Sequence, residues 1–346
     1  MKKNWLLYLF MIVCMSSFFT SCDKDDDKPT TPEWKEALGD YKADGALKLI
    51  INTQAATAQS AAPQSATLAA GTGENAKITL KNILPEEAEV AIDNVVPTKS
   101  GGDYTFSGTA TVGSTSVTLT GKLTGIKTDA RTLDLTVTRK IASSLVGNWA
   151  LNLDGTNPAK ALYFNVKSSN PLGSSLGTVL PGVLGGMLIK SVSEVNIFLP
   201  ETGLFNVNWK NQGDSEVTGM PDAIAQIVQI PWFESDGKLY IALSKDLLPL
   251  LAGIPGLPEG LDMNTLIALL VDKGGYYALP FNQVTSDGVT KFYFPKEILK
   301  NIVPILLPFL GSVEGIPASV LPLLGQLPEI VASAETFDVG LSFAKK

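Results

Sequence analysis

Few residues of this sequence could carry covalent or metal chemistry. Histidine is absent from all 346 residues, which excludes Ser-His-Asp and Cys-His catalytic arrangements and any metal site that uses imidazole. The two cysteines, Cys14 and Cys22, both lie at the N-terminal end. The rest of the chain therefore has no disulfide, no thiol nucleophile and no thiolate metal site. We expect no metal and no cofactor.

Carboxylates are the remaining candidates, because paired acidic residues hydrolyse glycosides without histidine. Acidic residues of the second half occur in the turn-like stretches PETG, GDSE and ESDG: Glu201, Asp214, Glu216, Glu234 and Asp236. In such turns a carboxylate is usually solvated, and nothing in their spacing selects a pair. We expect a protein without catalytic activity; a carboxylate-based hydrolase is the alternative.

Residues 1–22, MKKNWLLYLFMIVCMSSFFTSC, have the layout of a secretory signal, with two lysines before an apolar run. The run from Trp5 to Met15 is too short to span a membrane. Phe19-Thr20-Ser21-Cys22 resembles the bacterial lipobox, and the resemblance implies cleavage before Cys22 and acylation of its thiol. Residues 1–21 are then a lipoprotein signal peptide. Ordinary signal-peptidase cleavage is the competing interpretation.

An acidic tether is expected over residues 22–35, which begin with Cys22 and the charge run DKDDDK. Such a run is solvated and keeps a linker extended. Its position after the cysteine also resembles the export signal of Bacteroidetes-type lipoproteins that reach the outer cell surface. That resemblance implies a protein anchored in the outer membrane through acylated Cys22 and facing the cell exterior. Anchoring at the periplasmic face is the alternative.

The composition limits the other partners. A net charge of −7 and a pI of about 4.8 disfavour nucleic-acid binding, which depends on Lys and Arg neutralising phosphates. A hydrophobic content of 45% with 18% charged residues is typical of a folded protein. The length favours two domains, and the oligomeric state stays open.

Residues 36–143 show the period-two alternation of half-buried strands. Leu47 and Leu49 flank Lys48, and Leu133, Leu135 and Val137 repeat the pattern near the end of this segment. Several such strands separated by turn sequences predict a mainly β module, either a sandwich or a barrel.

A second β module is expected over residues 144–346. It opens with LVGNWALNLDG, in which Gly147-Asn148-Trp149 matches the Gly-x-Trp that begins the first strand of lipocalin-type barrels. Gly39-Asp40-Tyr41, at the start of the first module, is a less exact version of the same motif. The two-module layout resembles uncharacterised Bacteroidetes surface lipoproteins with calycin-like or lipocalin-like domains. The resemblance implies a barrel with an interior.

Leucine-proline phrases interrupt the strands of this second module. They are LPGVLGG at 180–186, LPLLAGIPGLP at 248–258, LPFLG at 307–311 and LPLLG at 321–325. A helix beginning at Lys296 and another after Asp262 contain or adjoin them, and internal prolines should kink or end such helices. We therefore predict short, broken helices that are apolar over most of their circumference and are buried against another part of the protein.

Two roles fit these apolar helices. They could plug one end of a barrel as plain core, or they could wall a cavity for an apolar or amphiphilic small ligand such as an acyl chain. A curved sheet wrapped around helices would show the same pattern as a barrel. Our candidate ligand-binding residues are Trp209, Leu248, Leu251, Leu266, Leu270, Leu306 and Phe309.

The alternative function is a carbohydrate-binding or protein-interaction surface lipoprotein without an internal ligand. Aromatic side chains beside polar ones suggest sugar sites at Trp209 with its neighbouring asparagines, at Trp232-Phe233 and at Tyr276-Tyr277. Aromatic residues in strands more often serve core packing. An exposed aromatic pair would favour a sugar, and an enclosed leucine-lined void would favour a lipid.

Overall fold

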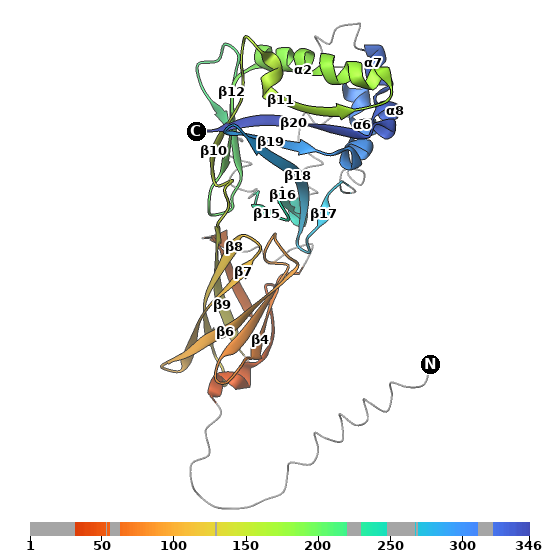
Figure 1. Cartoon of the computed structure of the whole chain (residues 1–346). Coiled ribbons are helices and arrows are strands. Elements are labelled where there is room, and N and C mark those ends of the chain that lie inside the picture. The colour runs from red at the N-terminus through yellow and green to blue at the C-terminus, as the bar shows by residue number, and fades with distance from the viewer. Residues whose placement is uncertain are drawn as a thin grey trace, which may run out of the picture. The chain divides into compact units, whose positions relative to one another are not determined.

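The computed structural model describes residues 32–52, 54–55, 63–128, 130–219, 230–247, 267, 269–310 and 321–346. Glu33–Lys346 form one compact unit. The unit is mainly β, with a nearly closed barrel-like sheet and a few helices (Figure 1), so the predicted fold class is confirmed. The described strands form one sheet before residue 142 and another after residue 146.

The first sheet has nine strands in the order β1-β4-β5-β6-β7-β8-β9-β2-β3. Neighbours are antiparallel except β2 and β9, which run parallel. The strands are β1 (Gly39–Lys42), β2 (Leu47–Ile51), β3 (Gln54–Ala55), β4 (Ser65–Ala70), β5 (Ala76–Lys81), β6 (Glu89–Ser100), β7 (Asp103–Val112), β8 (Thr115–Thr124) and β9 (Thr132–Ile141). Leu47 and Leu49 are buried and Lys48 is exposed, as the alternation predicts.

The folded part begins earlier than the predicted end of the tether at residue 35. Trp34, in the short 3-10 helix Glu33–Ala37, is almost fully buried in the core of the first sheet. Its ring meets Phe106 edge-on, with centroids 6.3 Å apart. A tryptophan contributes a large apolar area, so Trp34 helps to hold this 3-10 helix in the core of the first sheet.

The second sheet has eleven strands, with the path β14-β13-β12-β10-β20-β19-β18-β16-β15, while β11 pairs with β20 and β17 with β18. The strands are β10 (Gly147–Leu151), β11 (Leu162–Lys167), β12 (Val192–Leu199), β13 (Asn206–Asn211), β14 (Thr218–Gly219), β15 (Trp232–Ser235), β16 (Lys238–Ser244), β17 (Val271–Asp272), β18 (Tyr276–Ser286), β19 (Val289–Phe294) and β20 (Thr336–Lys345). The chain's last strand thus lies beside the first strand of its own sheet.

Two hairpins of the second sheet follow the turn chemistry of their sequences. Asp236 and Gly237 have φ of 51° and 69°, and Asp287 and Gly288 have φ of 52° and 74°. Two successive positive φ values define a type I′ turn, which matches the twist of the flanking strands and favours Asp-Gly. The conformation of the hairpins β15–β16 and β18–β19 is therefore determined by their own turn residues.

The two Gly-x-aromatic motifs adopt the same local structure. Gly39 and Gly147 have φ of 146° and 144°, values that favour glycine. The Tyr41 hydroxyl donates to the carbonyl of Ala37 at 2.6 Å, and the Trp149 indole nitrogen donates to the carbonyl of Leu145 at 2.8 Å. In each sheet the aromatic residue therefore fixes the chain four residues before it.

In the described part of the chain, four α-helices accompany the second sheet: α2 (Pro171–Ser191), α6 (Lys296–Leu310), α7 (Leu321–Gly325) and α8 (Leu327–Ser333). The helix predicted from Lys296 is confirmed. The expectation that every leucine-proline phrase forms a short, broken helix is wrong for LPGVLGG, because α2 has 21 residues and contains Pro181. Likewise α6 continues past Pro304. Pro304 is exposed, so water can hydrate the carbonyl that loses its helical partner.

Candidate ligand-binding surfaces

The helices cover one face of β11, β19 and β20, at one end of the second sheet (Figure 1). Phe164, Phe294 and Val339 project from that face and pack against the helical core. This core consists of the buried residues Leu176, Leu180, Leu299, Val303, Leu324, Leu327, Ile330, Val331, Ala334 and Phe337. The three strand residues are only half-buried. The helical layer therefore leaves part of the apolar inner face accessible.

Helix α2 approaches the sheet through small residues. A Cβ atom at Gly173 would lie 2.6 Å from the Ser168 side chain, and one at Gly177 would lie 3.0 Å from Val166. The other side of α2 is open, with Leu172 and Val179 exposed by 37% and 44%. By length and composition α2 is apolar enough to cross a membrane, although only 22% of its most apolar window is buried. Core helices of folded proteins meet the same criterion.

The predicted ligand-binding residues fall in different places. Trp209 is half-buried on β13, where it is paired with Val195 of β12 and Thr218 of β14. Leu270 is half-buried immediately before β17. Leu306 and Phe309 lie on α6, but their side chains are not among those that the structure describes. Four further predicted residues lie outside the described residues: Leu248, Leu251, Leu266 and Cys22. Leu299 and Val303 of the same helix α6 are buried in the helical core.

One of the three predicted sugar sites, Trp232-Phe233, belongs to the core of the second sheet. Trp232 and Phe233 are both 0% exposed, and the Phe233 ring stacks on Tyr240 with centroids 4.8 Å apart. Burial raises the pKa of Tyr276 to about 12. A saccharide cannot reach Trp232 or Phe233, so the hypothesis of a sugar site at this pair is wrong. Tyr276 is half-buried, and the Tyr276-Tyr277 site stays a prediction. Tyr277 is half-buried beneath the ammonium of Lys245, at 4.6 Å.

Three of the five acidic residues considered for hydrolysis, Glu201, Asp214 and Glu234, have hydrogen-bond or ion-pair partners. Glu234 accepts hydrogen bonds from the Gln283 amide, at 2.7 Å, and from the Ser143 hydroxyl. Glu201 pairs with Lys140 at 3.4 Å on the surface. Asp214 accepts from the Asn211 amide at 2.8 Å. Each of these three carboxylates thus takes part in a contact that holds the fold.

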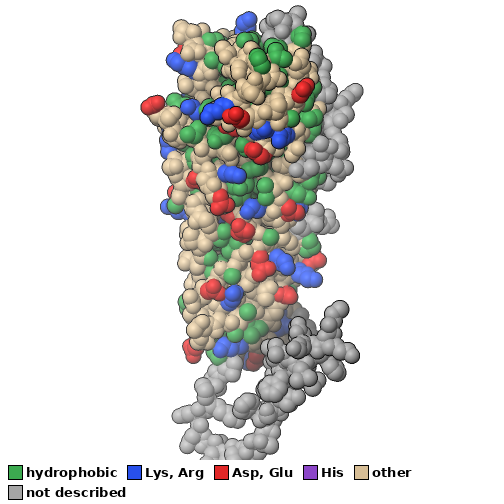
Figure 2. All heavy atoms as spheres, turned by 45° about the vertical axis from the view of Figure 1, so that its right-hand side comes forward, with side chains coloured by type: hydrophobic (Ala, Val, Ile, Leu, Met, Phe, Trp, Pro, Cys, Tyr) green, Lys and Arg blue, Asp and Glu red, His purple; other side chains and the backbone are tan. Residues whose placement is uncertain are grey.

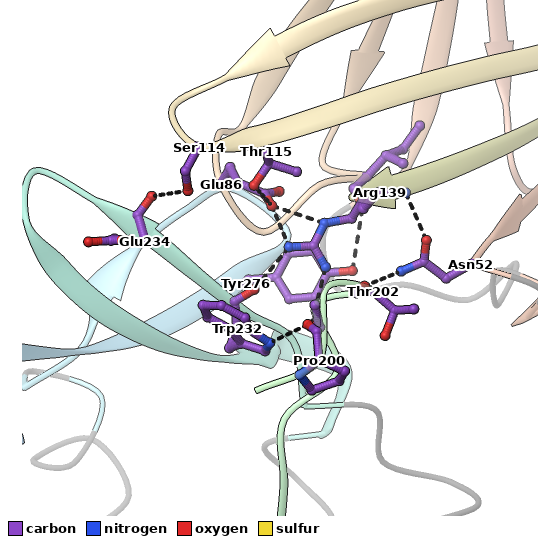
Figure 3. Close-up of polar contacts among 12 residues, drawn as sticks. Asn52, Glu86, Ser114, Thr115, Arg139, Pro200, Thr202, Trp232, Glu234 and Tyr276 are labelled. Atoms are coloured by element: carbon purple, nitrogen blue, oxygen red, sulfur yellow. Dashed lines mark hydrogen bonds and ion pairs between the residues drawn. The ribbon is translucent and has the colours of Figure 1, made fainter. Parts of the chain in front are cut away.

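A buried polar network lies where loops of the second sheet meet the end of β9 (Figure 3). The Arg139 guanidinium donates to Glu86 and to the main-chain carbonyls of Gly203, at 3.4 Å, and Trp232, at 3.1 Å. The Thr115 hydroxyl donates to the same Glu86 oxygen at 3.0 Å. This network connects residues of both sheets, and the Arg139 and Glu86 side chains are almost fully buried, so it is a structural contact.

A hollow of about 560 Å³ lies on the outer side of β2 and β6–β9. Its walls carry the hydroxyls of Thr98, Thr105, Ser107, Thr120 and Thr136, together with Lys48, Lys122 and Asp134. The face shown in Figure 2 likewise mixes Lys and Arg with Asp and Glu. Mixed charge does not favour nucleic acid.

One aromatic pair was not predicted from the sequence. Tyr163 of β11 and Tyr293 of β19 lie with ring centroids 4.9 Å apart. The alternation of each strand shows which way its tyrosine points, but their proximity depends on both strands pairing with β20. The sequence carries no signal for that register.

No protein-family model, curated protein or solved structure matches the chain.

Proposed function

We propose that this chain is a lipid-anchored, non-catalytic protein of the outer cell surface that binds an apolar or amphiphilic small ligand. The ligand lies between the inner face of the second sheet and its helices. The supporting observation is that Phe164, Phe294 and Val339 face the helices but remain half-buried. Ligand sites are usually apolar and often lie between helices or at the mouth of a barrel.

The energetics favour an acyl chain as the apolar part. Each methylene transferred from water to such a surface contributes about 0.8 kcal/mol, and a chain of many methylenes matches a surface composed of Phe, Val and Leu side chains. A polar ligand would gain little there, because its hydrogen bonds to water would not be replaced. The sheet supplies a preformed wall, so little ordering of the protein opposes binding.

The anchoring part of the proposal rests on the sequence. The lipobox-like Phe19-Thr20-Ser21-Cys22 and the acidic run after it are the features that support acylation and surface export. The compact unit starts at Glu33, so Cys22 lies outside it and its modification requires no change in the folded part.

Native mass spectrometry with oleic acid tests ligand binding. The chain from residue 23 onward retains the whole unit Glu33–Lys346 and can be compared with two variants. Val339→Trp places a larger side chain where Val339 packs against the helical core, whereas Val284→Trp changes an exposed residue of β18. We expect one bound oleate for the unmodified chain and for Val284→Trp, and loss of the adduct for Val339→Trp.

A second readout covers the case in which Val339→Trp does not fold. Saturating oleate should raise the free energy of unfolding of the unmodified chain, by about 2.7 kcal/mol at a hundredfold excess over Kd. A chain that shows neither an adduct nor a shift in unfolding would contradict the proposal.

A further inference from the structure

The face of β11, β20 and β19 opposite the helices carries a compact cluster of aromatic and polar side chains. Tyr163 and Tyr293 are both paired with Gly340, which lies in the strand between them. Asn165 is paired with Asp338 two residues further along. Because side chains alternate across a strand, all of these point away from the helices. Phe164 and Phe294, the neighbours of the two tyrosines in sequence, point toward them.

Gly340 determines how the tyrosines lie. A Cβ atom there would come within 2.1 Å of the Phe292 carbonyl oxygen and 2.5 Å of the Tyr293 Cβ. Without a side chain at this position, the two rings approach over the glycine at an angle of 53°. Both tyrosines are half-buried. The rings therefore form a tilted aromatic platform above the middle strand.

Hydrogen-bonding groups surround this platform. The Asn165 amide donates to an Asp338 oxygen at 2.9 Å, which leaves the other carboxylate oxygen available as an acceptor. The Lys291 ammonium lies 5.4 Å from the centre of the Tyr163 ring, a cation–π distance. Lys291 and Asp338 thus place one positive and one negative side chain beside the rings.

The cluster is also partly desolvated. Burial raises the pKa of Asp338, against the opposing effect of the hydrogen bond from Asn165. Burial likewise raises the pKa of Tyr163, and the nearby Asp338 adds to the increase. Polar groups that have lost part of their hydration interact more strongly with a ligand that offers hydrogen bonds.

We propose that the Tyr163–Tyr293 platform, with Asn165, Asp338 and Lys291, binds a neutral saccharide. The C–H face of a pyranose ring would lie on a tyrosine, and its hydroxyls would exchange hydrogen bonds with the carboxylate and the ammonium. A purely apolar ligand would leave those charged groups unsatisfied, and a polyanion would require an excess of positive charge. A saccharide offers a C–H face to the tyrosine rings and hydroxyl groups to the charged side chains.

This site is independent of the ligand proposed for the helix-covered face, because the two lie on opposite sides of the sheet. Loss of one binding activity therefore leaves the other unaffected, and each proposal can fail separately. The hydroxyl-lined hollow of the first sheet is not included, since it presents no exposed aromatic ring.

Affinity gel electrophoresis tests the site with soluble polysaccharides set into native gels: amylopectin, dextran, xylan, galactomannan and laminarin. The chain from residue 23 onward should be retarded by at least one of them. Tyr163→Ala and Tyr293→Ala should each weaken the apparent affinity about tenfold, or about 1.4 kcal/mol. Tyr163→Phe keeps the ring and should bind nearly as well as the unmodified chain.

Phe198→Ala is the matched control, because Phe198 is also a half-buried aromatic residue of the second sheet but belongs to β12. It should leave retardation unchanged. If a tyrosine variant does not fold, Asp338→Asn and Lys291→Met test the polar part of the same cluster without removing a ring. The proposal is overturned if no polysaccharide retards the chain, or if the cluster variants are retarded as strongly as the unmodified chain.

Discussion

Arg139 and Glu86 form an ion pair that is buried between residues of the two sheets. Their side chains are 2% and 4% exposed, and the Arg139 Nε donates to a Glu86 oxygen at 2.9 Å. Desolvating two charges opposes folding, so such a pair adds little net stability. Its remaining donors bind the carbonyls of Gly203 and Trp232. The pair therefore specifies which loops of the second sheet lie against the end of β9.

Removing one partner should strongly destabilise the protein, because the other charge is left buried. We expect Glu86→Ala to lower the free energy of unfolding by about 3–5 kcal/mol. Glu201→Ala breaks the exposed Lys140–Glu201 pair next to Arg139 in sequence and should cost at most about 1 kcal/mol. Urea denaturation measures both. Equal effects of the two substitutions would show that burial of the first pair has no energetic consequence.

We expect acid to remove a stabilising contribution of Glu33, which lies in the N-terminal 3-10 helix. Hydrogen bonds from Lys99 and Lys127 lower the pKa of Glu33 to about 2 from an ordinary value of 4.5. A carboxyl whose pKa is lowered by folding stabilises the protein above its unfolded pKa, and this contribution is lost as the pH falls through the folded pKa. The contribution of Glu33 should therefore disappear between about pH 4.5 and about pH 2.

Glu33→Gln removes this titration. Its melting temperature should lie below that of the unmodified chain at neutral pH, and the difference should shrink as the pH falls to about 2. Lys99→Met should reproduce part of the effect because it removes one of the two partners. A difference that stays constant over this pH range would contradict the assignment.

Two adjacent glycines of α2 should respond in opposite ways to substitution by alanine. A Cβ at Gly185 would lie 2.1 Å from the Pro158 carbonyl oxygen, whereas one at Gly186 meets nothing within 4 Å. Gly186→Ala should stabilise by up to about 1 kcal/mol, through helix propensity. Gly185→Ala should destabilise by about 1–3 kcal/mol, since main chain must move. Calorimetry of both variants checks the packing of α2 on the segment before β11.

The proposed anchor predicts a difference between the two cysteines. In the native host, Cys22→Ser should abolish incorporation of an alkyne-labelled fatty acid and release the protein from the membrane fraction. Cys14→Ser should leave both unchanged, because Cys14 precedes the proposed cleavage site. Labelling that persists in Cys22→Ser would exclude lipidation at this residue.

Local patterns in the sequence predicted much of the fold. Period-two alternation located the strands, and Asp-Gly pairs located hairpins whose positive φ values the structure shows. These features depend on neighbours within a few residues. Proline was a poorer guide, since α2 accommodates Pro181.

Long-range relationships could not be predicted in the same way. Arg139 and Glu86 are 53 residues apart, and nothing near either one in sequence indicates the other. Tyr163 and Tyr293 meet only because β11 and β19 both pair with Gly340. The sugar site suggested by Trp232-Phe233 failed for a related reason, because adjacency in sequence does not show whether a ring is exposed.

Mass spectrometry of the organic extract tests the central claim of an apolar or amphiphilic ligand most directly. The chain from residue 23 onward would be purified without detergent, its intact mass confirmed, and its solvent extract examined for lipids. We predict a fatty acid or phospholipid in stoichiometric amount. An extract that contains no lipid, and still contains none after incubation of the protein with membrane lipids, would show that the apolar helices and the inner face of the second sheet serve only as core.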